Sequence, residues 1–146
     1  MTAGHTLRIE RTFRAPAARV FDAFTNPDVM RRWWQAEHHW ETTSAEVDLR
    51  VGGAVRVVMR DPAADAEYGG GGRYTEIDPP HRLAFTWLWD GDTTRMLIEI
   101  DFEERDGATV VRLTHSGLWD EDAVRDHDDG WSNTFDNLDA ALAGER

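Results

Sequence analysis

The sequence predicts an α+β fold in which an antiparallel sheet wraps around one long C-terminal helix. The helix is expected from Asp120 to Ala143, where apolar residues recur at spacings of four and three and so share one face with His127. Upstream, apolar residues recur at every second position in segments joined by short turns, and such strands are antiparallel neighbours. An apolar sheet face and an apolar helix stripe bury each other. The stripe consists of Val124, Trp131, Phe135, Leu138 and Leu142.

The composition excludes several classes of function. The 146 residues contain no cysteine, which excludes disulfides, iron–sulfur clusters and thiolate zinc sites. All 16 basic residues are arginine, so neither a Schiff base nor a Walker-type lysine is available. The net charge of -12 argues against nucleic acid and membrane as partners. No run reaches the roughly 20 apolar residues of a membrane span and no signal pattern opens the chain, so we expect one cytoplasmic domain over residues 1–146.

The N-terminal part predicts one strand and two short helices. Alternation from Thr6 to Phe13 indicates the strand. Pro16 opens the first helix, which stops at Asn26-Pro27. The second helix follows directly and ends near Trp33-Trp34, in front of a loop rich in aromatic and imidazole groups.

The central part predicts three strands. The first carries Val47, Leu49 and Val51 on one face and turns at Gly52-Gly53, and the second continues to Met59. Residues 61–71 combine proline, alanine, aspartate and a glycine run, which indicates a mobile loop. The third strand then places Gly72, Tyr74 and Glu76 on one face.

Three further strands precede the long helix. They are expected at 82–90, 96–103 and 110–115, with turns at Asp90-Gly91 and Asp106-Gly107. Alternation places His115 on the inward face of the last strand, beside the apolar Val111 and Leu113.

Several motifs, in the right order along the chain, resemble one known family. They are Ala15-Pro16 through Trp33-Trp34, Gly52-Gly53, the run Gly72 to Trp87, Thr109 to Gly117, and Gly130-Trp131. This pattern is similar to the activator of heat-shock protein 90 ATPase homologue-like branch of the START-like superfamily, also called SRPBCC or Bet v 1-like. The resemblance implies a helix-grip fold: a seven-stranded sheet that grips the C-terminal helix, with a cavity between them.

The chain departs from that branch in two ways that concern the cavity. Phe135 stands where the branch usually has leucine, and the inward positions are unusually rich in tryptophan. Both departures suggest a narrower or more aromatic pocket. The superfamily includes carriers, cyclases, oxygenase domains and co-chaperone domains, so the resemblance alone does not select a function.

The inward faces of the predicted elements together supply a candidate ligand site. Seven tryptophans are many for a small domain, and each buried indole N–H needs a partner, so an aromatic-lined pocket accounts for them better than core packing does. We expect a small hydrophobic or aromatic ligand and no cofactor. The candidate ligand-binding residues are Trp34, Trp40, Met59, Tyr74, Trp87, Trp89, Met96, Ile98, His115, Trp119, His127, Trp131 and Phe135.

Catalytic and metal-binding interpretations rest on fewer residues. His115 is either a core histidine or an acid–base group at the end of the cavity. Glu76 is either a buried carboxylate of raised pKa or a strand-end residue paired with an arginine. His38 and His39 are adjacent without a further ligand motif, so no metal site is predicted.

Three functions therefore remain open. A ligand-binding domain is the leading interpretation; the alternatives are a cyclase, aromatase or hydrolase that uses His115 and Glu76, and a co-chaperone that stimulates the heat-shock protein 90 ATPase. We also expect the loop from Asp61 to Gly71 and the segment from Trp33 to Trp40 to flank the mouth of the cavity, where exposed indoles would favour a homodimer.

Overall fold

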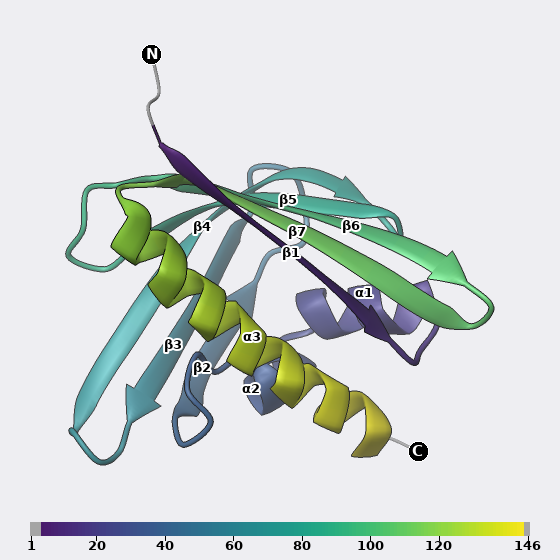
Figure 1. Cartoon of the computed structure of the whole chain (residues 1–146), viewed down its shortest axis with the longest axis horizontal. Helices are drawn as coiled ribbons and strands as arrows, with labels where there is room; N and C mark the ends of the chain where they lie inside the picture. Colours follow the sequence, from purple (N-terminus) through teal and green to yellow (C-terminus); the bar gives the residue numbers. More distant parts are fainter. Residues whose placement is uncertain (1–3, 145–146) are drawn as a thin grey trace.

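The computed structural model describes residues 4–144. Seven antiparallel strands form one sheet in the order β1-β7-β6-β5-β4-β3-β2, and the sheet curves around the long helix α3 (Figure 1). The strands are β1 (His5–Phe13), β2 (Glu41–Val47), β3 (Ala54–Asp61), β4 (Ala66–Asp78), β5 (Arg82–Trp89), β6 (Met96–Arg105) and β7 (Ala108–Leu118). The helices are α1 (Ala17–Thr25), α2 (Pro27–Trp33) and α3 (Glu121–Gly144). The predicted fold class is confirmed, including the two short helices after the first strand.

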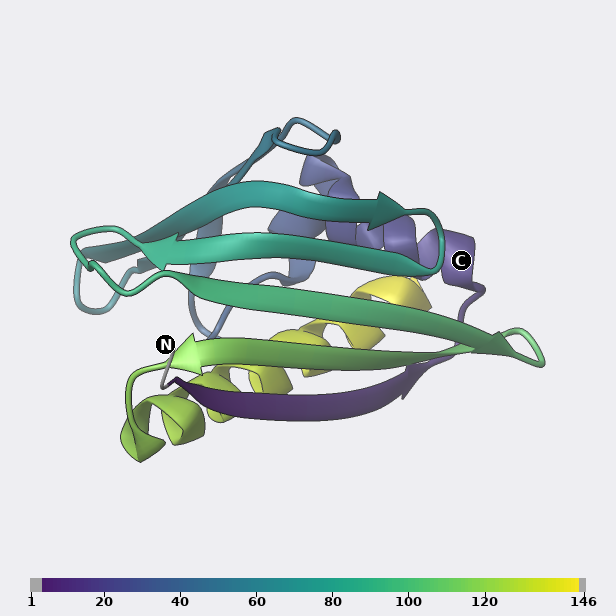
Figure 2. The same ribbon diagram turned by 90° about the horizontal axis from the view of Figure 1, so that it is seen from above.

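Helix α3 runs beneath the sheet along most of its length (Figure 2). Its N-terminus is capped by Asp120, whose carboxylate accepts a hydrogen bond from the backbone N–H of Ala123 at 2.8 Å. Trp131, Phe135 and Leu138 form its buried face. None of the helices within residues 4–144 is long and apolar enough to cross a membrane.

Helices α1 and α2 fill the space beside the C-terminal half of α3 (Figure 1). Phe24 packs edge-to-face against Trp33, with ring centroids 4.8 Å apart, and it also contacts Phe135. The Trp33 indole N–H donates to the carbonyl oxygen of Ala23 at 3.0 Å. Aromatic rings therefore fill the core at this end of the molecule.

The first central strand is shorter than its alternation predicts. β2 ends at Val47, and Leu49 and Val51 are exposed in the connection to β3. There, Gly52 has a φ of +84°, a conformation that glycine adopts without strain. The apolar alternation continues past the residue at which the backbone turns. The prediction that Leu49 and Val51 lie with Val47 on one face of the strand was therefore wrong.

Residues 61–71 form mostly strand, not the predicted loop. β3 continues to Asp61, a short turn follows, and β4 begins at Ala66. The glycine run lies inside β4 because a side chain there would collide with β5: a β-carbon at Gly70 would come within 2.7 Å of the Trp87 indole, and one at Gly72 would overlap the backbone of Thr86. The glycines thus indicate close packing in a strand rather than a loop.

Glu76 does not share the face of Tyr74. The pairing of β4 with β5 shifts register between Tyr74 and Glu76, and an extra residue in one strand reverses the faces that follow it. Tyr74 is buried, whereas the Glu76 carboxylate accepts a hydrogen bond from the Arg82 guanidinium at 2.8 Å on the exposed surface. The predicted inward orientation of Glu76 was wrong.

Candidate functional site

A hollow of about 220 Å³ lies beside the N-terminal half of α3. Strands β3 to β7 form its floor, and the segment that joins α2 to β2 (residues 34–40) forms its rim. Its lining is largely aromatic. The lining residues are Trp34, Ala36, Trp40, Met59, Tyr68, Trp87, Trp89, Ile98, His115, Asp126, His127, Gly130, Trp131 and Thr134.

Six of these side chains form a closed circuit of neighbouring rings, which we call the aromatic circuit. The distances between the centroids of successive rings all lie between 5.0 and 6.3 Å. Strands, helix α3 and the α2–β2 segment all contribute, so the circuit exists only in the folded chain. Its members, in order, are Trp34, Trp87, Trp89, His127, His115 and Trp131.

His115 is a neutral member of this circuit. Its Nδ1 accepts a hydrogen bond from the Trp131 indole N–H at 3.0 Å, so its own proton lies on Nε2, 3.1 Å from the sulfur of Met96. Burial, and secondarily the neighbouring His127, lowers its pKa from 6.5 to about 3. The imidazole therefore stays uncharged at neutral pH, with both nitrogens occupied.

His127 is held in the same way by a second indole. Its Nε2 accepts a hydrogen bond from the Trp89 indole N–H at 3.1 Å, and its Nδ1–H donates to the carbonyl oxygen of Ala123 at 2.7 Å. In each pair the tryptophan fixes the tautomer of the histidine. Neither imidazole keeps a nitrogen free to take a proton from a substrate.

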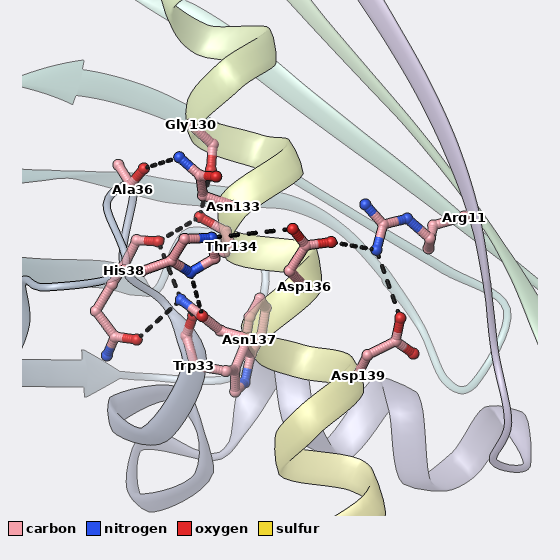
Figure 3. Close-up of polar contacts among 11 residues, drawn as sticks. Arg11, Trp33, Ala36, His38, Gly130, Asn133, Thr134, Asp136, Asn137 and Asp139 are labelled. Carbon is pink, nitrogen blue, oxygen red and sulfur yellow. Dashed lines mark hydrogen bonds and ion pairs between the residues drawn. The ribbon is translucent and has the colours of Figure 1, made fainter.

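Helix α3 fixes the rim of the hollow through three polar side chains (Figure 3). The Thr134 hydroxyl donates to the carbonyl oxygen of Gln35 at 3.0 Å, and the Asn133 amide donates to that of Ala36 at 2.9 Å. Asn137 donates to the carbonyl oxygen of Trp33 at 3.4 Å and accepts from Nδ1–H of His38 at 2.9 Å. These contacts set the position of Trp34 and Trp40 over the hollow.

The structure gathers most of the predicted ligand-binding residues around this hollow. Tyr74, Met96 and Phe135 are instead buried next to the wall, and Trp119 is exposed with its ring 5.6 Å from that of His127. The residues that line the hollow as predicted are Trp34, Trp40, Met59, Trp87, Trp89, Ile98, His115, His127 and Trp131.

Five wall residues are absent from the sequence prediction. Tyr68 lies in the stretch that was interpreted as a loop; its ring stacks on Trp40 with centroids 4.7 Å apart. The other four are small or polar and give no apolar periodicity that could have identified them. They are Ala36, Asp126, Gly130 and Thr134.

The two catalytic candidates do not meet. His115 lines the hollow, whereas Glu76 lies on the outside of the sheet in an ion pair with Arg82. Within the described range, no three histidine, aspartate or glutamate side chains gather in a way that could hold a metal ion.

Comparison with known proteins agrees with the fold. Residues 14–143 match the family model described as activator of Hsp90 ATPase homolog 1-like protein. A crystal structure from Chromobacterium violaceum has 27% identity and a TM-score of 0.86, covering 92% of this chain and 95% of its own. The AHSA1 protein of Silicibacter pomeroyi has 26% identity and a TM-score of 0.85, with coverage of 97% and 100%.

A more distant structure shares the fold alone. An HSP90 activator from Plasmodium falciparum has 22% identity and a TM-score of 0.74, covering 94% of this chain and 96% of its own. A search of curated proteins finds no match to the chain.

Proposed function

The chain belongs to the activator of Hsp90 ATPase homolog 1-like family, and we propose that it binds a small hydrophobic or aromatic molecule in the hollow beside α3. The observation that carries this proposal is the aromatic circuit. Six rings from three separate elements (β5, β7 and α3) and one connecting segment line one hollow, although core packing would be achieved more simply with aliphatic residues.

The chemistry of the wall favours binding over catalysis. The imidazole of His115 is neutral, both imidazoles have their nitrogens hydrogen-bonded, and Asp126, the one carboxylate among the described lining residues, is exposed. The proposed pair of His115 and Glu76 would need both groups at one enclosed space, and Glu76 is outside it. Apolar burial and ring stacking are the interactions that this wall supplies.

Thermal melting in the presence of a panel of uncharged mono- and bicyclic aromatic compounds tests the proposal. Binding to the folded state raises Tm in a concentration-dependent way. Trp87→Leu, which removes one ring of the circuit, should weaken binding about tenfold. Trp119→Leu, which removes an exposed ring outside the hollow, should leave it unchanged. The proposal fails if no compound raises Tm, or if both variants bind as the parent does.

Stimulation of an Hsp90 ATPase is the second candidate, and the family description and the Plasmodium falciparum HSP90 activator favour it. The net charge of -12 would direct such an interaction toward a basic surface. An ATPase assay with the cognate chaperone tests this candidate. A stimulation that falls with ionic strength would support it, and an unchanged rate at saturating protein would reject it.

A further inference from the structure

The indole N–H groups around the hollow fall into two sets. Those of Trp89 and Trp131 donate to the two imidazoles. Those of Trp34, Trp40 and Trp87 make no hydrogen bond within the part of the chain that the structure describes, and all three residues line the hollow. The Trp40 N–H is in addition covered from solvent. One wall thus holds three donors without acceptors.

Strong acceptors are lacking on the buried part of the same wall. Both imidazole nitrogens that carry lone pairs already accept from indoles. The Thr134 hydroxyl has a single proton, which lies within reach of the carbonyl oxygens of Gln35 and Gly130 at 3.0 and 2.6 Å, so its oxygen remains a weak neutral acceptor. Among the described lining residues, the carboxylate of Asp126 is exposed at the rim. The wall therefore offers donors to a bound molecule and few acceptors.

This imbalance selects the polarity of the ligand. A buried donor without a partner is unfavourable, so a ligand oxygen that accepts from an indole N–H gains affinity. A ligand with its own N–H or O–H would find few acceptors on this wall and would bind less tightly than a ligand that only accepts. A carboxylate would accept well, but the net charge of -12 and Asp126 at the rim repel an anion. A neutral carbonyl oxygen accepts a hydrogen bond, adds no donor and carries no negative charge.

Two pairs of rings in the wall stack on each other. Trp34 and Trp87 lie nearly parallel, at 19° with centroids 5.9 Å apart, and Trp40 and Tyr68 are parallel within 10°. At these spacings no third ring fits between the members of a pair, so the pairs form a rigid aromatic surface against which a ligand packs. The chain also contains no cysteine and no lysine, the nucleophiles that add most readily to quinones, so an electrophilic carbonyl compound would remain unmodified in the hollow.

We propose that the ligand is an uncharged aromatic ketone or quinone whose carbonyl oxygen accepts a hydrogen bond from one of the unpaired indoles Trp34 and Trp87, since the N–H of Trp40 is covered. This inference rests on the ligand-binding function proposed above and specifies its substrate class. The binding step is non-covalent. Stacking and burial supply the contact area, and the unpaired N–H groups supply the selectivity for a carbonyl.

Calorimetric titration with three bicyclic compounds of matched size tests the inference. Indane has neither donor nor acceptor, 1-indanone has a carbonyl acceptor, and indole has a donor. We expect 1-indanone to bind about tenfold more tightly than indane, and indole to bind no better than indane. Trp34→Phe and Trp87→Phe keep a ring but remove the N–H. At least one of them should reduce the preference for 1-indanone to below about threefold.

The controls separate the inference from the function on which it rests. Trp119→Phe removes an unpaired N–H on the exposed surface and should leave the preference unchanged. Equal binding of all three compounds would overturn the inference while the binding function stands. No binding of any compound, together with no Tm shift across the wider panel, would overturn both. Tighter binding of phenyltrimethylammonium than of 1-indanone would show that the aromatic lining prefers a cation, and it would also overturn the inference.

Discussion

At the residue scale, His115 combines deep burial with a fully used hydrogen-bonding capacity. It is 1% exposed, accepts from Trp131 and faces the sulfur of Met96. A protonated imidazole could not accept the indole N–H, and the buried charge would be unfavourable. The residue therefore belongs to the wall as a neutral, polar link between β7 and α3.

The pKa of His115 predicts an acid-sensitive stability. The pKa of about 3 in the folded protein lies below the ordinary 6.5. Between pH 3 and pH 6.5 the unfolded chain therefore binds a proton at His115 that the folded protein does not bind. The free energy of unfolding is unaffected above pH 6.5 and falls as the pH is lowered, by about 1.4 kcal/mol per pH unit well below 6.5. At pH 5 this one group should reduce it by about 2 kcal/mol.

Urea unfolding at pH 7 and pH 5 measures this effect. His115→Gln keeps an acceptor for Trp131 but does not titrate. In this variant the free energy of unfolding should differ little between pH 7 and pH 5. Arg56 and Arg112 hold the pKa values of Asp90 and Glu103 below their ordinary 3.8 and 4.5. These carboxylates contribute stability above those values and lose it only as the pH falls below them, outside the measured window. An equal loss in the parent and the variant would contradict the prediction.

Two glycines, one against the Trp87 indole and one in the lining of the hollow, should respond oppositely to alanine. A β-carbon at Gly70 would come within 2.7 Å of the Trp87 indole, whose other face is occupied by Trp34, so Gly70→Ala should destabilise by about 1–3 kcal/mol. A β-carbon at Gly130 would meet only that of Ala36, at an ordinary 3.5 Å. Gly130→Ala should therefore stabilise α3, by up to about 1 kcal/mol.

Chemical denaturation of the two alanine variants beside the parent tests this contrast. The helical content measured by circular dichroism should be unchanged in both variants, since neither substitution lengthens or shortens a helix. A loss of more than about 2 kcal/mol in Gly130→Ala would mean that a β-carbon clashes in the core at that position.

At the element scale, α3 serves both as one wall of the hollow and as the support of its rim. Its polar residues donate to the backbone carbonyls of the α2–β2 segment, which has no regular structure of its own over residues 34–40. The ring positions of Trp34 and Trp40 therefore depend on side chains of α3 that are a hundred residues away in sequence.

Thr134→Val should loosen that rim. The substitution keeps the shape but removes the hydroxyl that donates to the carbonyl oxygen of Gln35, and only the longer contact from Asn137 remains. We expect a loss of about 1–2 kcal/mol and faster hydrogen exchange of the amides in residues 35–40. Ser132→Ala is the matched control, because the Ser132 hydroxyl makes no hydrogen bond among residues 4–144. Unchanged exchange in Thr134→Val would refute the supporting role.

What the sequence can predict at this scale is what local periodicity encodes. The helical stripe of α3 and the alternation of β5 placed Trp87, Trp89 and Trp131 correctly. Prediction failed where the pattern continued through a turn, as at Leu49, and where a bulge reversed the faces, as at Glu76. Residues of the wall that carry no periodic signal, such as Ala36, are placed only by tertiary packing.

At the scale of the whole molecule, acidic residues outnumber arginines by 28 to 16. Arginines on the outer face of the sheet are already shared among several carboxylates: Arg82 contacts Glu76, Glu99 and Asp101. The remaining excess has no cationic partner to neutralise it. Folding brings these charges together, so self-repulsion opposes the compact state.

We therefore predict that Tm at pH 7 rises between about 10 and 150 mM NaCl, as the Debye length falls from about 30 Å to about 8 Å. Salt also weakens ion pairs such as Arg56–Asp90, but exposed pairs contribute only about 0–1 kcal/mol each, whereas the repulsion acts on every excess carboxylate. A second series at pH 4.8, the isoelectric point, is the control: with little net charge, added salt should leave Tm unchanged or lower it. A fall of Tm with salt at pH 7 would show instead that the arginine pairs outweigh the repulsion.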